Sequence, residues 1–131
     1  MSPKQVLVIE DEFQVGLDLQ CLLSGAGFEV VGPMMTLDEA LHAAEQAGLQ
    51  CAVVDANLNG HSAGPVAEKL QERGIPFVVV TGYERPFLPL SFSAAPRIAK
   101  PVQASSLLAI VRQLCSEFKP IAAFPSAKPL P

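Results

Sequence analysis

Five residues that directly follow short apolar runs could together transfer a phosphoryl group. They are Glu10, Asp11, Asp55, Thr81 and Lys100. A carboxylate can act as a nucleophile, a hydroxyl can donate a hydrogen bond, and a lysine ammonium is a point charge suited to phosphate oxygens. An isolated acid at such a place is most often only solvated. The inference of a phosphoryl-transfer site therefore depends on all five residues occurring in this pattern.

The elements that must position these residues alternate between strands and helices. Strands are predicted over residues 5–9, 28–32, 51–54, 76–80 and 98–99, and helices over 13–23, 36–48, 62–73 and 105–118. Thr36 and Glu39 have the spacing of a capping box at the start of the second helix. Regular alternation predicts right-handed crossovers and a parallel sheet. We therefore expect an α/β, flavodoxin-like, doubly wound sheet of five parallel strands in the order 2-1-3-4-5.

Two segments depart from this alternation. Between Tyr83 and Pro96 the prolines predict a degenerate fourth helix, a loop with at most one helical turn. Residues 119–131 are rich in proline and are expected to be a mobile tail that follows a single domain of residues 1–118.

The carboxyl ends of the first and third strands are where a sheet of this order binds its ligand. Glu10, Asp11 and Asp55 should therefore meet there, although each contact between like charges near 4 Å costs about 4 kcal/mol at an effective dielectric of 20. Raised pKa values or a bound cation would relieve this repulsion. Oxygen ligands favour Mg²⁺ or Mn²⁺. Asn57 is a weaker candidate ligand, because asparagines in such turns are mostly structural.

Composition excludes several classes of function. The net charge is −4 and lysines and arginines form no cluster, so nucleic-acid binding is not expected. No apolar run has the length of a membrane span, and no cleavable leader is evident, so a cytoplasmic location is expected.

The cysteines and histidines predict no further site. Cys21, Cys51 and Cys115 are odd in number, far apart and among apolar neighbours, which favours buried reduced thiols over a disulfide framework or a zinc site. His42 and His61 are isolated, and we interpret both as surface residues.

Four motifs carry a resemblance to a known family. They are Val6-Leu7-Val8-Ile9-Glu10-Asp11-Glu12, Val53-Val54-Asp55 with Leu58 and Gly60, Val80-Thr81-Gly82, and Lys100-Pro101. Together they make the sequence resemble, over about residues 4–118, the receiver domain of two-component response regulators.

The resemblance implies a role for each residue of the set. Glu10 and Asp11 would bind Mg²⁺, and Asp55 would accept phosphate from a sensor histidine kinase or a histidine phosphotransfer protein. Thr81 and Lys100 would contact the phosphoryl group, and Asn57 would offer its backbone carbonyl to the metal. The chain would then be a stand-alone regulator rather than an enzyme with its own substrate, and it would act on an unknown output protein or as a phosphate sink.

The sequence also departs from the family pattern. Glu10 stands where aspartate is commoner, and Arg97 stands where the family has a switching Tyr or Phe. Together with the degenerate fourth helix, Thr81-Gly82-Tyr83 resembles the single-domain "FATGUY" regulators of α-proteobacteria. In that reading Tyr83 is the mobile aromatic; the alternative is a ring packed on the surface.

Two other functions stay open at this point. A degenerate receiver would bind a partner without being phosphorylated. A small phosphatase of haloacid-dehalogenase type would also use an aspartate nucleophile, but such enzymes usually need a second acid two residues later, where this chain has Asn57.

Overall fold

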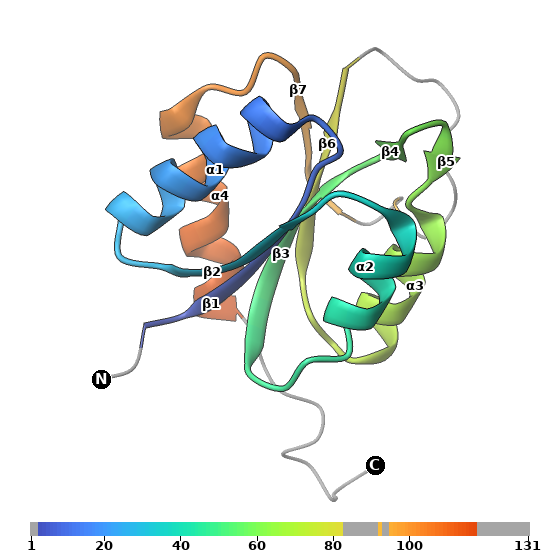
Figure 1. Ribbon diagram of the computed structural model, residues 1–131. Coiled ribbons are helices and arrows are strands. Elements are labelled where there is room, and N and C mark those ends of the chain that lie inside the picture. Colours follow the sequence, from blue (N-terminus) through green and yellow to red (C-terminus); the bar gives the residue numbers. More distant parts are fainter. Residues whose placement is uncertain (1–2, 83–91, 93–94, 118–131) are drawn as a thin grey trace, which may run out of the picture.

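Five parallel strands form one sheet in the order β2-β1-β3-β6-β7 (Figure 1). The computed structural model describes residues 3–82, 92 and 95–117. The strands are β1 (Gln5–Ile9), β2 (Glu29–Met34), β3 (Leu49–Asp55), β6 (Phe77–Thr81) and β7 (Arg97–Ala99). When the small hairpin β4–β5 is left out of the count, this is the predicted order 2-1-3-4-5. The predicted fold class is confirmed.

In the part of the chain that the structure describes, helices cover both faces of the sheet (Figure 1). α1 (Phe13–Gly25) and α4 (Ala104–Glu117) lie on one face, and α2 (Leu37–Ala43) and α3 (Gly64–Glu72) lie on the other. Alternate residues of a strand point to opposite faces. Val6 and Val8 accordingly pack with α1 and α4, whereas Leu7 and Ile9 pack toward α2 and α3. Because both faces are covered, the central strands are continuous apolar runs, which is the pattern that their sequences show.

The predicted helix cap at Thr36 is confirmed. The Glu39 backbone N–H donates to Thr36 Oγ1 at 3.1 Å, and the Met35 backbone N–H donates to Glu39 Oε1 at 2.9 Å. The predicted end of this helix near Gly48 is wrong, because α2 ends at Ala43. The Arg73 guanidinium donates to the carbonyls of Ala44 at 2.6 Å and Gln46 at 3.0 Å. The side chain of Arg73, which directly follows α3, thus satisfies carbonyls just past the end of α2, a contact that local sequence does not reveal.

A short antiparallel hairpin follows β3. It consists of β4 (Asn57–Leu58) and β5 (His61–Ser62). Asn59 and Gly60 connect them with φ angles of 53° and 84°. Two consecutive positive φ angles are typical of a type I′ turn, for which Asn-Gly is the preferred pair.

Predictions on the remaining segments have mixed outcomes. Cys51 and Cys115 are buried, but Cys21 is exposed on α1, so the prediction of three buried thiols is wrong for Cys21. His42 and His61 are exposed, as predicted.

The expected loop over the fourth-helix region lies mostly outside the described residues, and so does the proline-rich tail over 119–131. Within the described part of the chain, no helix combines the length and apolar character that crossing a membrane requires.

Close packing of α1 on β2 depends on Gly16. A Cβ atom added there would lie 2.9 Å from both Cβ and Cγ of Pro33. We therefore expect Gly16→Ala to lower the free energy of unfolding by about 1–3 kcal/mol, because the helix must move away from the strand. Gly25→Ala is the matched control, since nothing lies within 4 Å of its added Cβ. Urea unfolding measures the stability of both variants. Equal free energies of unfolding in Gly16→Ala and Gly25→Ala would contradict this account.

Candidate functional site

Three carboxylates meet at the carboxyl ends of two adjacent strands. Glu10 and Asp11 follow β1, and Asp55 is the last residue of β3, whose Val54 is paired with Ile9. One oxygen from each of the three acids lies within 4.8 Å of the others. Glu10 is 1% exposed and Asp55 is 5% exposed, so two of the charges are taken out of water. The structure therefore brings together the acids that the strand order predicts at one edge.

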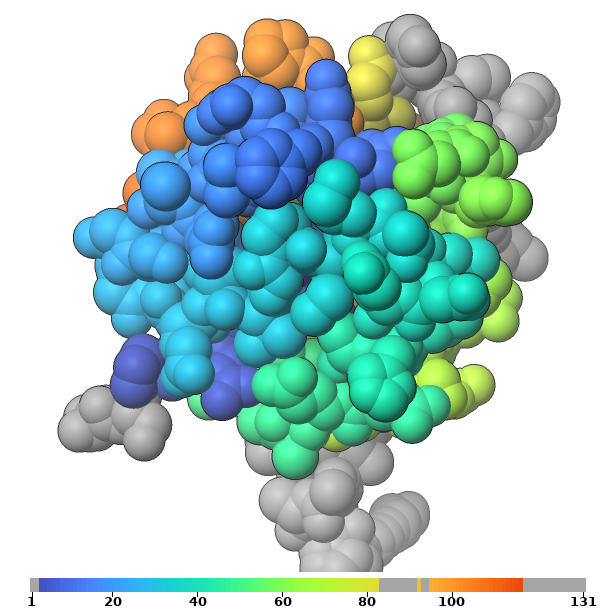
Figure 2. Space-filling view, in the orientation of Figure 1, coloured from blue at the N-terminus to red at the C-terminus, as the bar shows by residue number. Residues whose placement is uncertain are grey.

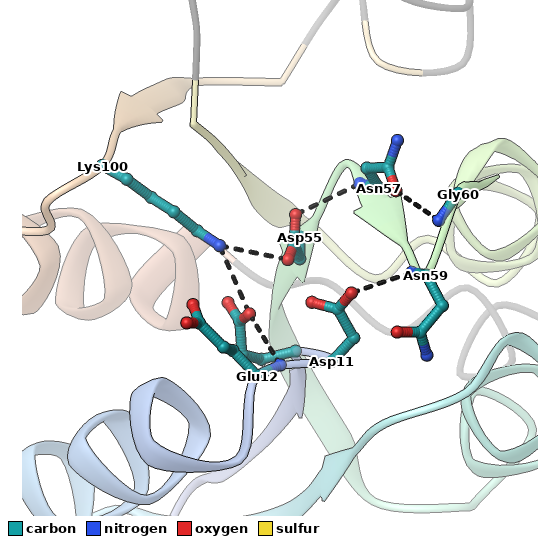
Figure 3. Close-up of polar contacts among 8 residues, drawn as sticks. Asp11, Glu12, Asp55, Asn57, Asn59, Gly60 and Lys100 are labelled. Carbon is teal, nitrogen blue, oxygen red and sulfur yellow. Dashed lines mark hydrogen bonds and ion pairs between the residues drawn. The ribbon is translucent and has the colours of Figure 1, made fainter.

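Lys100 supplies a positive charge directly beside these acids. Its Nζ lies 3.2 Å from Asp55 Oδ2 and 3.3 Å from Glu10 Oε2 (Figure 3). The Lys100 backbone N–H donates to the Thr81 carbonyl at 2.9 Å, which holds the end of β7 beside the end of β6. One ammonium group thus bridges two buried carboxylates.

Backbone N–H groups fix the orientation of each acid. Asp55 Oδ1 accepts from Asn57 at 3.1 Å, Asp11 Oδ2 accepts from Asn59 at 2.8 Å, and Glu10 Oε2 accepts from Glu12 at 3.1 Å (Figure 3). The bond from Asn59 is a contribution that the sequence reasoning missed. Its signal was the Asn-Gly pair, which predicts a tight hairpin beside the site but not which group its N–H reaches.

The Asn57 side chain is engaged within the hairpin. Its Oδ1 accepts from the Gly60 backbone N–H at 2.8 Å, as in an Asx turn (Figure 3). Of the oxygens of Asn57, the backbone carbonyl is therefore the better candidate for a metal ligand.

A cavity of about 410 Å³ opens above the acids. Its lining consists of Asp11, Asp55, Ala56, Asn57, Thr81, Gly82 and Lys100. Thr81 is the buried last residue of β6, and it brings a hydroxyl-bearing side chain to this edge. Of the two predicted switch residues, Arg97 is exposed at the start of β7 and is not among the lining residues, while Tyr83 lies outside the described residues.

Glu10 is the acid most perturbed by its surroundings. Burial and the neighbouring charge of Asp55 raise its pKa to about 7, against an ordinary value of 4.5, although the Glu12 N–H and Lys100 oppose the shift. Burial also raises the pKa of Asp55, against the opposing effects of the Asn57 N–H and Lys100. These shifts are the expected result of placing like charges together in a partly dehydrated site.

The other two charged groups are shifted toward their ionised forms. Partial burial opposes ionisation of Asp11, but hydrogen bonding, above all from the Asn59 N–H, holds its pKa below the ordinary value. Burial likewise opposes the charge on Lys100, but the attraction of Asp55 and Glu10 raises its pKa overall. In the pocket, Asp11 and Lys100 are therefore charged at neutral pH.

The residues present fit a hard divalent cation. Glu10 Oε1 is buried and has no hydrogen-bond partner among the described residues. An orphaned carboxylate oxygen in such a place is costly unless it is protonated or coordinated. Three carboxylates and a backbone carbonyl are also the donor set that Mg²⁺ and Mn²⁺ prefer.

The raised pKa of Glu10 predicts an unusual dependence of stability on pH. An acid whose pKa is higher in the folded than in the unfolded protein stabilises the fold while it is protonated. Stability is therefore lost as the pH rises from 4.5 to about 7. In metal-free buffer with a chelator, Glu10→Gln should abolish a loss of roughly 3 kcal/mol in the free energy of unfolding over this window. Glu68→Gln, at an exposed position on α3, is the control. Denaturant titrations that gave Glu10→Gln and the wild type the same pH profile would contradict the assignment.

Curated relatives of the chain are regulatory proteins. No protein-family model matches the chain. It is 30% identical over 113 residues to the phyllosphere-induced regulator PhyR of Methylorubrum extorquens, covering 83% of this chain and 42% of PhyR. It is 27% identical over 125 residues to the transcriptional regulatory protein PdtaR of Mycobacterium tuberculosis, covering 92% of this chain and 61% of PdtaR. The chain thus spans less than two thirds of the length of these relatives.

Solved structures share the fold over nearly their whole length. A CheY-like response regulator receiver domain from Methylobacillus flagellatus superposes with a TM-score of 0.74 at 25% identity, covering 86% of this chain and 99% of that domain. The receiver domain of a sensor histidine kinase from Pseudomonas aeruginosa PAO1, solved with a magnesium ion coordinated in its active-site cleft, has a TM-score of 0.77 at 16% identity and covers 88% of this chain and 99% of that one. Fold, curated relatives and solved structures together support a response regulator receiver domain of the CheY-like type, the kind of domain found in two-component regulation.

Proposed function

We propose that this chain is a phosphorylation-controlled switch, in which Asp55 accepts a phosphoryl group from a sensor histidine kinase or a histidine phosphotransfer protein. The observation that carries this proposal is the convergence of three carboxylates and one lysine at the carboxyl edge of the sheet, beside a cavity that Asp11, Asp55 and Lys100 line. The receiver-like fold and the regulatory relatives support it.

In this proposal Asp55 is the nucleophile. One of its carboxylate oxygens attacks the phosphorus of the donor, and the bond from phosphorus to the donor's nitrogen or oxygen breaks as the acyl phosphate forms. The Asn57 N–H and Lys100 hold the two Asp55 oxygens at 3.1 and 3.2 Å, so the side chain is already oriented before the donor arrives.

Lys100 and Thr81 bind the phosphoryl group once Asp55 has accepted it. After transfer, the Lys100 ammonium exchanges its contact with Asp55 for the phosphoryl oxygens, which carry more negative charge. The Thr81 hydroxyl donates to another phosphoryl oxygen, and Gly82, which also lines the cavity, lets the backbone approach. Movement of Thr81 and Lys100 toward the phosphoryl group would change the surface at the ends of β6 and β7.

The acids Glu10 and Asp11, with Asp55 and the Asn57 carbonyl, are the groups that would hold Mg²⁺ or Mn²⁺. When bound, the cation would offset the charge of the carboxylates and of the incoming phosphoryl oxygens. The orphaned Glu10 Oε1 supports this assignment, and so does the magnesium in the cleft of the Pseudomonas receiver domain.

Output is proposed to pass through contact with another protein, or through simple draining of phosphate. The FATGUY-like role of Tyr83 stays a prediction, because Tyr83 lies outside the described residues. Arg97 opens β7 three residues before Lys100, where the family's aromatic switch would stand. A conventional switch built on that position is therefore not part of the proposal.

Phosphorylation should be specific to Asp55. Incubation with Mg²⁺ and a small phosphodonor such as acetyl phosphate should add the mass of one phosphoryl group to the wild type and none to Asp55→Asn, because the amide is not a nucleophile. Asp38→Asn, at an exposed position in the first turn of α2, should be labelled like the wild type. Intact-protein mass spectrometry is the measurement. Labelling that persists in Asp55→Asn would end the proposal, and a wild type that stays unlabelled would favour the degenerate receiver.

Metal binding should depend on Asp11. Its charge is retained at neutral pH, so Asp11→Asn should weaken Mg²⁺ binding at least tenfold. Isothermal titration with MgCl₂ would measure the affinity, with Asp18→Asn on α1 as the matched control. Equal affinity in Asp11→Asn and the wild type would place the cation elsewhere.

A further inference from the structure

Two buried thiols face each other on the side of the sheet that carries α1 and α4. Cys51 lies in β3 and Cys115 in the last turn of α4, and their Sγ atoms are 3.2 Å apart. Both side chains belong to the same apolar cluster, with Cys51 0% and Cys115 5% exposed. A hydrogen bond between thiols 64 residues apart in the sequence is a specific juxtaposition rather than a consequence of chain proximity.

The pair lies away from the phosphoryl-transfer site. Cys51 precedes Asp55 by four residues on β3 and pairs with Val6 of β1. Neither thiol is among the residues that line the cavity above the acids. The chemistry of the pair is therefore open to a test that does not depend on the proposed function of Asp55.

We infer that Cys51 and Cys115 are a redox modification site, which hydrogen peroxide converts to an intramolecular disulfide. The sulfurs must approach from 3.2 Å to about 2.0 Å, a shift of roughly an ångström that side-chain rotation and small movements of α4 can supply. Cys21 cannot take part, because it is exposed on α1 whereas the other two are buried.

The two thiols differ in acidity, which assigns their roles. The hydrogen bond with Cys51 lowers the pKa of Cys115, and the nearby charge of Lys4 acts in the same direction. The same hydrogen bond, together with burial, raises the pKa of Cys51. Cys115 is also the less deeply buried of the two, so it is the sulfur that meets the oxidant.

The reaction proceeds in two balanced steps. The Cys115 thiolate attacks one oxygen of hydrogen peroxide, forming a sulfenic acid and releasing hydroxide, which takes up the proton that Cys115 had lost. The Cys51 sulfur then attacks the Cys115 sulfur, its proton leaves with the displaced oxygen as water, and the S–S bond forms. In total, two thiols are oxidised by two electrons and one peroxide is reduced to two molecules of water.

The cross-link would join α4 to β3 and close a loop between residues 51 and 115 that contains Asp55, Thr81 and Lys100. Constraining the unfolded chain in this way should raise the midpoint of thermal unfolding by about 10 °C. A reductant should reverse the shift.

The test uses the full chain carrying Cys21→Ser, so that no exposed thiol can link two molecules. After treatment with hydrogen peroxide, alkylation under denaturing conditions and mass spectrometry count the free thiols. We expect both free thiols to be lost and the mass of the chain to fall by two hydrogens. A cross-linked peptide should join residues 51 and 115, and the midpoint of thermal unfolding should rise. In the unsubstituted chain, Cys21 reports whether the oxidant was active.

Two results would overturn the inference. One is that both thiols remain free under conditions that oxidise Cys21. The other is that Cys115 gains oxygen and no cross-linked peptide forms. Cys51→Ala and Cys115→Ala, each made in the Cys21→Ser background, should show neither the mass loss nor the rise in midpoint. A rise that persists in either variant would also contradict the disulfide.

Discussion

The repulsion among Glu10, Asp11 and Asp55 is the interaction on which the rest of this site depends. Two of these carboxylates are almost completely buried, and oxygens of all three lie within 4.8 Å of one another. Bare Coulomb repulsion at such distances costs several kcal/mol. The molecule offsets it with the bridging ammonium of Lys100, with three backbone N–H donors, and by raising the pKa of Glu10 to about 7. What remains is an affinity for positive charge, which is what the proposed binding of a divalent cation needs.

The fold brings charged residues from distant parts of the sequence together at one place. Parallel strands place every carboxyl end at one edge, so residues 10, 55, 81 and 100 meet although they are spread along the sequence. The same arrangement stabilises the fold elsewhere, because the central strands β1, β3 and β6 are covered on both faces and bury almost their whole length. A core of this kind tolerates a destabilising acidic cluster at its rim, and the cost would be recovered if a ligand neutralised the cluster.

Much of this could be predicted from the sequence, because the signals were strictly local. Strand order followed from the alternation of apolar runs with helical segments, and the meeting of Glu10, Asp11 and Asp55 followed from that order. What escaped prediction depends on contacts between distant segments: the early end of α2, where Arg73 binds the carbonyls of Ala44 and Gln46, and the hairpin N–H that orients Asp11. The facing pair Cys51 and Cys115 escaped for the same reason, since their wide spacing along the chain predicted no contact.

The central claim is that a divalent cation occupies the space between these three carboxylates. A crystal structure of the chain grown with Mn²⁺, with diffraction recorded at a wavelength where manganese scatters anomalously, would test this most directly. The account predicts an anomalous peak within coordination distance, about 2.2 Å, of oxygens of Asp11 and Asp55, with Glu10 nearby. A fully loaded crystal with its manganese bound elsewhere, or with Lys100 still bridging undisturbed carboxylates and no peak beside them, would contradict it.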